Sequence, residues 1–110
     1  MYLPAPDETI WTGTLRLVVQ IPAARSLKDR RKVVWGFRDR VRARLGLAVA
    51  EVGHLERHDM AVLAVAGVSN DARLLRSQLD AARAEAASLA EGLLVDHDLE
   101  IIGFRAAPDR

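Results

Sequence analysis

The sequence predicts an α+β domain with the ferredoxin-like fold, a βαββαβ plait in which two helices cover one face of a four-stranded antiparallel sheet. Its 110 residues, half of them hydrophobic, fit one compact core and are too few for two. The spacing of its apolar residues predicts, in order, a strand, a helix, two strands, a helix and a strand. The connections between these segments are short, as in a compact domain.

The first strand is predicted over residues 12–21 because apolar residues occupy every second position there. These residues are Leu15, Leu17, Val19 and Ile21, and Thr12, Thr14, Arg16 and Gln20 lie between them. A period of two indicates a strand with one buried face.

The first helix is predicted to begin at Ser26 and to end at Gly46. Pro22 breaks the strand before it, and Ser26 is followed three residues later by Asp29, a shorter form of the capping box. Helical spacing then relates four apolar residues, Val34, Phe37, Val41 and Leu45. Gly46 is a residue type typical of the end of a helix.

The middle of the chain predicts a hairpin followed by the second helix. Residues 48–52 and 60–68 are rich in Val and Ala and are joined by a charged turn. Asn70 is expected to cap the second helix, which Gly92 is expected to close. The apolar stripe of this helix consists of Leu75, Leu79, Ala82, Ala86 and Leu89.

The last strand is predicted over residues 94–104. Val95, His97, Leu99 and Ile101 alternate there with Asp96, Asp98 and Glu100. Because the last strand of a plait pairs with the first, the acidic stripe is expected to meet Arg16 across the sheet. Carboxylates on an edge strand also oppose aggregation through that edge.

The domain is predicted to span residues 10–104. Residues 1–9, with two prolines and two acids, are expected to form a flexible leader, and residues 105–110 a short tail. The chain has no Cys, no signal-peptide pattern and no apolar run long enough for a membrane-spanning helix. We therefore expect a cytoplasmic protein that does not enter membranes.

The charge is concentrated in one segment. Residues 25–44 contain nine of the sixteen Lys and Arg residues and only two acids, so this segment carries +7 and the rest of the chain −6. Such polarised charge concerns partners rather than fold, and it favours an anionic partner.

The cations of the predicted first helix are expected on its solvent face. At about 100° per residue, Val34, Phe37 and Val41 share the inner sector, and the cations lie mostly opposite with Trp35 among them. A Trp among arginines is able to stack a base while the arginines neutralise phosphates. Alternatively, Trp35 covers a groove or a subunit interface, and the cations are hydrated charges on the helix surface that bind no ligand.

The start of this helix is a second candidate for anion binding. Arg25, Ser26, Lys28 and Arg31 gather where free backbone N–H groups favour an anion, although a simple N-cap with solvated charges explains the same residues. The predicted anion- or nucleic-acid-binding residues are Arg25, Ser26, Lys28, Arg31, Lys32, Trp35, Arg38 and Arg42.

Three stretches of the chain resemble a known family. They are Ser26-Leu27-Lys28-Asp29-Arg30-Arg31, Ala50-Glu51-Val52 and Val68-Ser69-Asn70-Asp71. With them, residues 11–104 resemble the small bacterial YlxP-like domain of unknown function, which implies a ferredoxin-like fold and no established activity. Gly53 and His58 stand where that family tends to have Asp and Trp, so the resemblance implies no role for the hairpin turn.

No group of residues predicts a catalytic site, a metal site or a cofactor. Arg25 and Asn70 suggest a phosphohydrolase pair, but no Gly-rich cradle follows the first strand. His54 and His58 have H-x3-H spacing, which presents both rings on one face only in a helix, and this segment is a predicted turn.

The sequence favours a non-enzymatic domain that binds RNA or the ribosome through its basic first helix. The first alternative is a structural or regulatory homo-oligomer, in which the basic helix of one copy meets the acidic remainder of another. A phosphate-binding hydrolase is the other. The predicted open face lacks the aromatic residues that RNA-recognition plaits carry on their central strands, so binding through the sheet is not expected.

Overall fold

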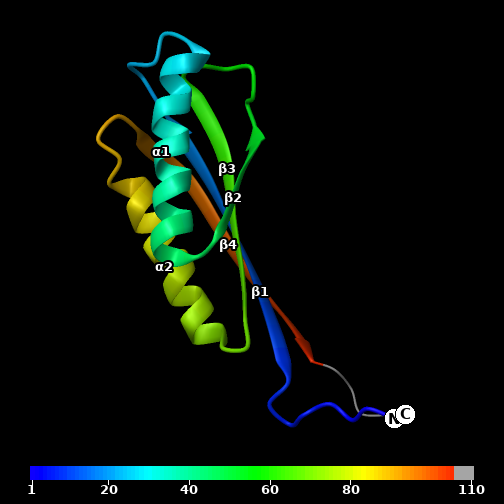
Figure 1. Cartoon of the computed structure of the whole chain (residues 1–110). Helices are drawn as coiled ribbons and strands as arrows, with labels where there is room; N and C mark the ends of the chain where they lie inside the picture. Colours follow the sequence, from blue (N-terminus) through cyan, green and yellow to red (C-terminus); the bar gives the residue numbers. More distant parts are fainter. Residues whose placement is uncertain (106–110) are drawn as a thin grey trace.

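A computed structural model describes residues 1–105 and confirms the predicted fold. The elements are β1 (Thr9–Gln20), α1 (Leu27–Leu45), β2 (Ala48–Gly53), β3 (Met60–Ser69), α2 (Ala72–Ala87) and β4 (Leu93–Arg105). The strands form one antiparallel sheet in the order β2-β3-β1-β4, and both helices lie on the same side of it (Figure 1). The protein is thus an α+β ferredoxin-like plait.

The core lies between the sheet and the helices. The alternating residues of β1 that were predicted to be buried, such as Leu15 and Leu17, are fully enclosed. They pack in one cluster with Phe37 of α1 and with Leu75 and Leu79 of α2. The predicted inner face of α1 is confirmed, since Val34, Phe37 and Val41 are buried and Leu45 is half-buried.

A pair of glycines lets α2 approach the sheet closely. Gly13 on β1 and Gly67 on β3 are cross-strand partners. A Cβ atom at Gly13 would lie 2.5 Å from Cδ1 of Leu79, and one at Gly67 would lie 2.5 Å from Cδ2 of Leu47 and 3.0 Å from Cδ1 of Leu75. These distances are shorter than van der Waals contact, so side chains at these two positions would push the helix side of the core outward.

The ends of α2 differ from the prediction. Asp71, not Asn70, is its N-cap, because Oδ1 of Asp71 accepts hydrogen bonds from the N–H groups of Arg73 and Leu74. The helix ends at Ala87 with Ser88 as its C-cap, before the predicted end at Gly92. The Ser88 hydroxyl donates a hydrogen bond to the Glu85 carbonyl at 3.0 Å. Such a local bond competes with continuation of the helix beyond Ala87.

The alternation predicted for β4 is interrupted at Val95. The register between β1 and β4 shifts between Val18 and Val19, which face Asp96 and Leu94 respectively. Val95 is therefore the extra residue of a bulge, and Leu94 packs against the core in its place. His97 lies on the helix side of the sheet, opposite Leu17, but is exposed. Leu99 and Ile101 pack against the core as predicted, and Asp96, Asp98 and Glu100 point to the other face.

The sheet extends beyond the helices as a two-stranded ribbon. Thr9 pairs with Arg105 and Ile10 with Phe104, past the end of β3 (Figure 1). The radius of gyration is 16.7 Å, against about 13 Å for a compact chain of this length. The strands thus reach one residue beyond each predicted boundary of 10 and 104, and residues 106–110 of the predicted tail lie outside the described residues.

In residues 1–105, neither helix has the length and apolar character needed to cross a membrane.

Candidate nucleic-acid interface

The predicted N-cap of α1 at Ser26 is confirmed, but the Asp29 carboxylate reaches the N–H of Arg25 and not that of Ser26, as a standard capping box would require. Ser26 has an extended backbone, and its Oγ accepts a hydrogen bond from the N–H of Asp29 at 3.1 Å. The Asp29 carboxylate accepts from the N–H of Arg25 at 3.0 Å. The cap thus places a carboxylate at the positive end of the helix dipole, where it is favourable and where it also competes with an external anion.

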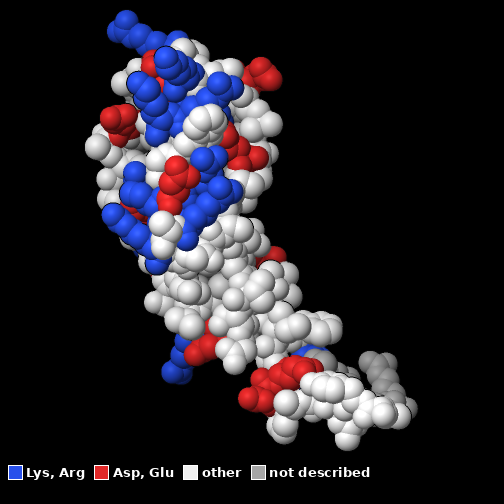
Figure 2. Space-filling model, viewed as in Figure 1, with Lys and Arg blue, Asp and Glu red and all other residues white. Residues whose placement is uncertain are grey.

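Five cations of α1 gather on its side away from the sheet, whereas Arg30 is buried and Arg40 pairs with Glu85 of α2. Lys28, Arg31, Lys32 and Arg42 are exposed, and Arg38 is half-buried. Figure 2 shows Lys and Arg gathered over the end of the molecule where α1 lies, with few acidic groups among them. We call Lys28, Arg31, Lys32, Trp35, Arg38 and Arg42 the basic face of α1.

Trp35 lies at the surface, as the helical spacing predicted. Its exposed fraction is 44%. The guanidinium carbon of Arg31 lies 5.8 Å from the centre of its ring, and that of Arg38 lies 5.3 Å away. Both distances fall in the range of cation–π contact, so the ring holds two guanidinium groups on one line of the helix.

The cations of this region differ in how far they are neutralised. Nε of Arg38 pairs with Asp39 at 3.0 Å, and Nη2 of Arg42 donates to the Val49 carbonyl at 3.2 Å. Within residues 1–105, Arg42 and Arg44 at the end of α1 make no ion pair, and neither do four cations near its start, namely Arg25, Lys28, Arg31 and Lys32. These four lie in the first two turns of α1 and just before it, so the strongest positive field is expected there.

Arg30 is a buried cation that the sequence reading left out of the candidate site. Its side chain is 4% exposed, and Nη1 lies 2.7 Å from Oε1 of Glu51 on β2. Nε donates to the Met60 carbonyl at 3.0 Å, and Nη2 has no hydrogen-bond partner in the described chain. The position was detectable, because Arg30 precedes Val34 by four residues and Phe37 by seven and so lies on the apolar stripe.

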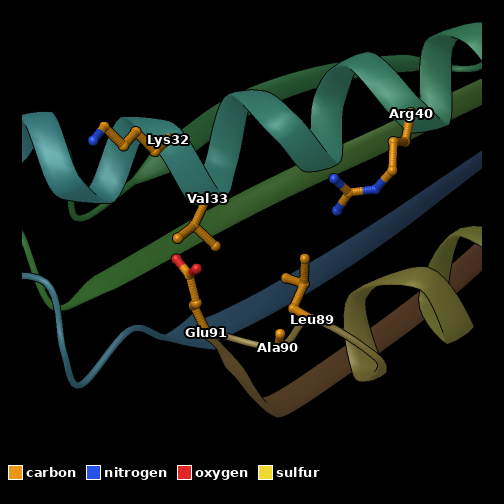
Figure 3. A pocket seen from close by; sticks show the side chains of 6 residues that line it. All are labelled: Lys32, Val33, Arg40, Leu89, Ala90 and Glu91. Atoms are coloured by element: carbon orange, nitrogen blue, oxygen red, sulfur yellow. The ribbon is translucent and has the colours of Figure 1, made fainter.

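A small pocket lies between α1 and the connection from α2 to β4. It has a volume of about 180 Å³ and is lined by Lys32, Val33, Arg40, Leu89, Ala90 and Glu91. Figure 3 shows the Glu91 carboxylate directed toward Val33 and the Arg40 guanidinium directed toward Leu89. Arg40 is neutralised by Glu85, so the pocket offers an anion little beyond Lys32. Ligand pockets usually exceed about 300 Å³.

The structure keeps Arg25 and Asn70 apart. Arg25 follows the end of β1 that pairs with Met60, whereas Asn70 follows the opposite end of β3, where Ser69 pairs with Trp11. The ten residues of β3 separate them by about 30 Å. The two residues therefore do not form a common phosphoryl site.

The hairpin turn is organised by contacts of its own side chains. Nδ1 of His58 lies 2.8 Å from the Ala24 carbonyl, and Arg57 pairs with Asp59 at 2.9 Å. The Arg57 guanidinium lowers the pKa of Asp59 through its hydrogen bond. His54 has a φ of 52°, and the described residues bring together no group of three or more His, Asp or Glu side chains that suits a metal ion.

The predicted contact between Arg16 and the acidic stripe is confirmed. Nη1 of Arg16 lies 3.0 Å from Asp96 and 3.2 Å from Asp98, on the sheet face opposite the helices. The hydrogen bond from Arg16 lowers the pKa of Asp96 and raises that of Arg16 itself. The stripe is thus partly neutralised within the sheet.

Comparison with known families identifies the group to which this chain belongs. The family described as "Protein of unknown function (DUF503)" matches residues 12–99, so the chain is a member of that family. None of the curated proteins matches it.

Two solved structures are similar to this chain. The de novo designed protein Foldit4 has 14% sequence identity and a TM-score of 0.49, and the match covers 91% of this chain and all of the design. A variant of SnoaB, a cofactor-independent oxygenase from Streptomyces nogalater, has 16% identity and a TM-score of 0.45, covering 89% of this chain and 95% of SnoaB.

Proposed function

We propose that this member of the DUF503 family is a non-enzymatic domain that binds RNA, free or within the ribosome, through the basic face of α1. The observation that carries the proposal is a helix side on which Lys28, Arg31 and Lys32 are exposed and make no ion pair in residues 1–105. From Lys28 to Arg42 this side is about 21 Å long at the rise of an α-helix. We also propose that the chain is YlxP-like within its family, on the strength of residues 26–31.

The arrangement of Trp35 supports contact with phosphates rather than with bases. Arg31 and Arg38 both lie over its ring, so a base that stacked there would have to displace a guanidinium group. The ring instead holds two phosphate-binding groups in place at little cost in side-chain entropy. We therefore expect the basic face to follow an RNA backbone and to discriminate by shape more than by sequence.

The proposal is tested by titration of RNA at several salt concentrations. A structured RNA and an unstructured strand of the same length are compared, and the affinity for the structured RNA is expected to fall steeply with salt. A slope of about three or more in log affinity against log salt would match the neutralisation of three to five phosphates. Absent or salt-independent binding would overturn the proposal.

A pair of matched variants locates the interaction. Arg31→Ala/Lys32→Ala removes two cations from the basic face, and Arg73→Ala/Arg76→Ala removes two exposed cations from α2. Both double variants change the net charge equally, so a general electrostatic effect would weaken binding equally. We expect about a tenfold or greater loss only for the α1 pair. Equal losses would contradict binding through α1.

Isolation from the host gives an independent test. The protein is purified at low salt, and the bound nucleic acid and ribosomal subunits are identified. RNA that is lost in Arg31→Ala/Lys32→Ala would support the proposal, whereas its retention in that variant would assign the RNA to another surface.

The charge-driven oligomer has less support than RNA binding. It needs the acidic stripe of β4 to attract the α1 of a second copy, but Arg16 already pairs with Asp96 and Asp98. Such an oligomer would dissociate as salt is raised, which a sedimentation experiment at low and high salt would detect.

A further inference from the structure

One face of the sheet has no cover in residues 1–105. Both helices lie on the other side (Figure 1), and the strand registers fix which side chains point away from them. On the two central strands these include Ala64 and Ala66 of β3 and Thr14 and Arg16 of β1. We call this side the open face; it is not part of the basic face of α1.

The open face carries large apolar side chains in register with one another. Val68, Thr12 and Ile102 form one row across three strands, and Ile10 and Phe104 form the next row along the ribbon. Val68 is 71% exposed, Ile102 58% and Phe104 61%. Large apolar side chains that are exposed next to one another, rather than singly, are typical of interaction surfaces, so the rows point to a surface that a partner covers.

The charges on the open face are arranged so that covering it leaves few of them unpaired. The positions on β2 and β3 that face outward hold Ala48, Ala50, Val62, Ala64, Ala66 and Val68, none of them charged. Arg16, near the centre, is already paired with Asp96 and Asp98, and Glu100, opposite Thr14, is the third carboxylate of this face and makes no ion pair within residues 1–105. These carboxylates lie on the edge strand β4, where an interface has its solvated rim.

The open face is large enough for a stable dimer. Its strands have 12, 6, 10 and 13 residues, which at about 3.3 Å per residue and about 4.8 Å per strand cover about 650 Å² in projection. Side-chain relief raises the accessible area toward the ~800 Å² per partner of a standard interface. A second copy offers the same uncharged half and the same extended ribbon.

We propose that two copies of this chain associate through their open faces as an isologous dimer. The two sheets pack face to face, with β3 and β1 at the centre and β4 at the rim. Both α1 helices then lie on the outside, so the dimer presents two basic faces instead of hiding them. This proposal does not depend on RNA binding, since it uses the other side of the sheet.

Sedimentation equilibrium of the intact chain at low and high salt tests the proposal. A dimer held by apolar contacts is expected to persist at high salt, in contrast to one held by the charge of α1. The measurement extends to about 100 µM, at which a dimer with a micromolar Kd is almost fully formed. A monomer throughout this range, or a dimer that salt dissociates, would overturn the proposal.

Matched variants place the interface. Ala66→Glu sets a carboxylate at the centre of the open face, where its cross-strand neighbours Thr14 and Ala48 are small and uncharged. The dimer should weaken by about 100-fold or more, because an unpaired carboxylate would be desolvated. Ala84→Glu, which introduces the same charge at an exposed position of α2, should leave the dimer intact.

A second variant guards against misfolding of the first. Val68→Lys changes a side chain that is already exposed, so its melting temperature is expected to match that of the unmodified chain. It should also weaken the dimer. A dimer that survives both Ala66→Glu and Val68→Lys, with circular dichroism showing folded protein, would place the interface elsewhere and refute the proposal.

Discussion

Nη1 of Arg30 and Oε1 of Glu51 lie 2.7 Å apart and join the first turn of α1 to the edge strand β2. Arg30 is 3% exposed, so this is a charged contact within the protein rather than on its surface. The two residues come from residues 26–31 and 50–52, two of the three stretches singled out in the sequence analysis, and both lie within the part of the chain that matches the DUF503 family. The contact gives these stretches a structural role, separate from any ligand.

Removing one partner of this pair should destabilise the fold. In Glu51→Ala the Arg30 charge stays buried without a counter-ion, which typically costs about 3–5 kcal/mol. Because the Glu51 side chain is 27% exposed, water would replace part of the interaction, and we expect a loss of about 2–3 kcal/mol in the free energy of unfolding. Urea denaturation measures it.

The double variant Arg30→Met/Glu51→Leu is the control for the ion pair. It fills a similar volume without a charge and should recover most of the lost stability, since apolar replacements of buried ion pairs are often neutral or better. If the double variant is less stable than Glu51→Ala, the ion pair contributes more to the free energy of unfolding than the neutralisation of the buried Arg30 charge.

The glycine pair beneath α2 predicts a packing defect. Gly67→Ala places a methyl group 2.5 Å from Leu47 and 3.0 Å from Leu75, two buried leucines that have little room to move. We expect a loss of about 1–3 kcal/mol, as is typical of overpacking. Thermal unfolding measures it, and Gly36→Ala is the control, because its Cβ would meet only the end of the flexible Arg40 side chain, at 3.2 Å.

The two guanidinium groups over Trp35 predict a graded effect on RNA binding. Trp35→Phe keeps an aromatic face for Arg31 and Arg38 and should retain affinity within about threefold, whereas Trp35→Ala should lose more. Fluorescence anisotropy of labelled RNA measures both. If Trp35→Phe were as damaging as the loss of both arginines, the indole itself would be the contact with RNA.

The ion pair of Arg16 predicts a stability difference that depends on pH. The hydrogen bond from Arg16 lowers the pKa of Asp96 from its usual 3.8. A carboxyl group whose pKa is lower in the folded state stabilises the fold above the unfolded pKa and loses this effect as the pH falls through the folded pKa. Wild type should therefore exceed Asp96→Asn in stability near pH 7, with the difference closing below about pH 4. A constant difference across that range would exclude ionisation as its cause.

The regular parts of the fold were predictable because local periodicity and global packing agree. The alternation through Leu15 and Leu17 predicted the buried face of β1, and the cap of α1 at Ser26 was visible in the spacing to Asp29. The meeting of Arg16 with Asp96 followed from the topology alone. Such features need only a period, a cap or a strand order.

The missed features depend on contacts between distant segments. The bulge at Val95 requires the register of β4 against β1, and an alternating sequence does not reveal where one residue is extra. Whether Asp71 or Asn70 is the N-cap depends on the residue at which the backbone changes from extended to helical, and the two residue types do not predict this. Arg30 was not assigned to a buried ion pair, because its counter-ion, Glu51, is twenty-one residues away in the sequence.

The pairing of Thr9 with Arg105 means that the chain enters and leaves the sheet at one place. This place is the tip of the ribbon, at the opposite end of the molecule from the start of α1 (Figure 1). The two ends of the domain are therefore adjacent, as in domains that can be inserted into a loop of another protein. If residues 9–105 were inserted into a surface loop of a carrier protein, the domain should fold there with its basic helix directed away from the carrier.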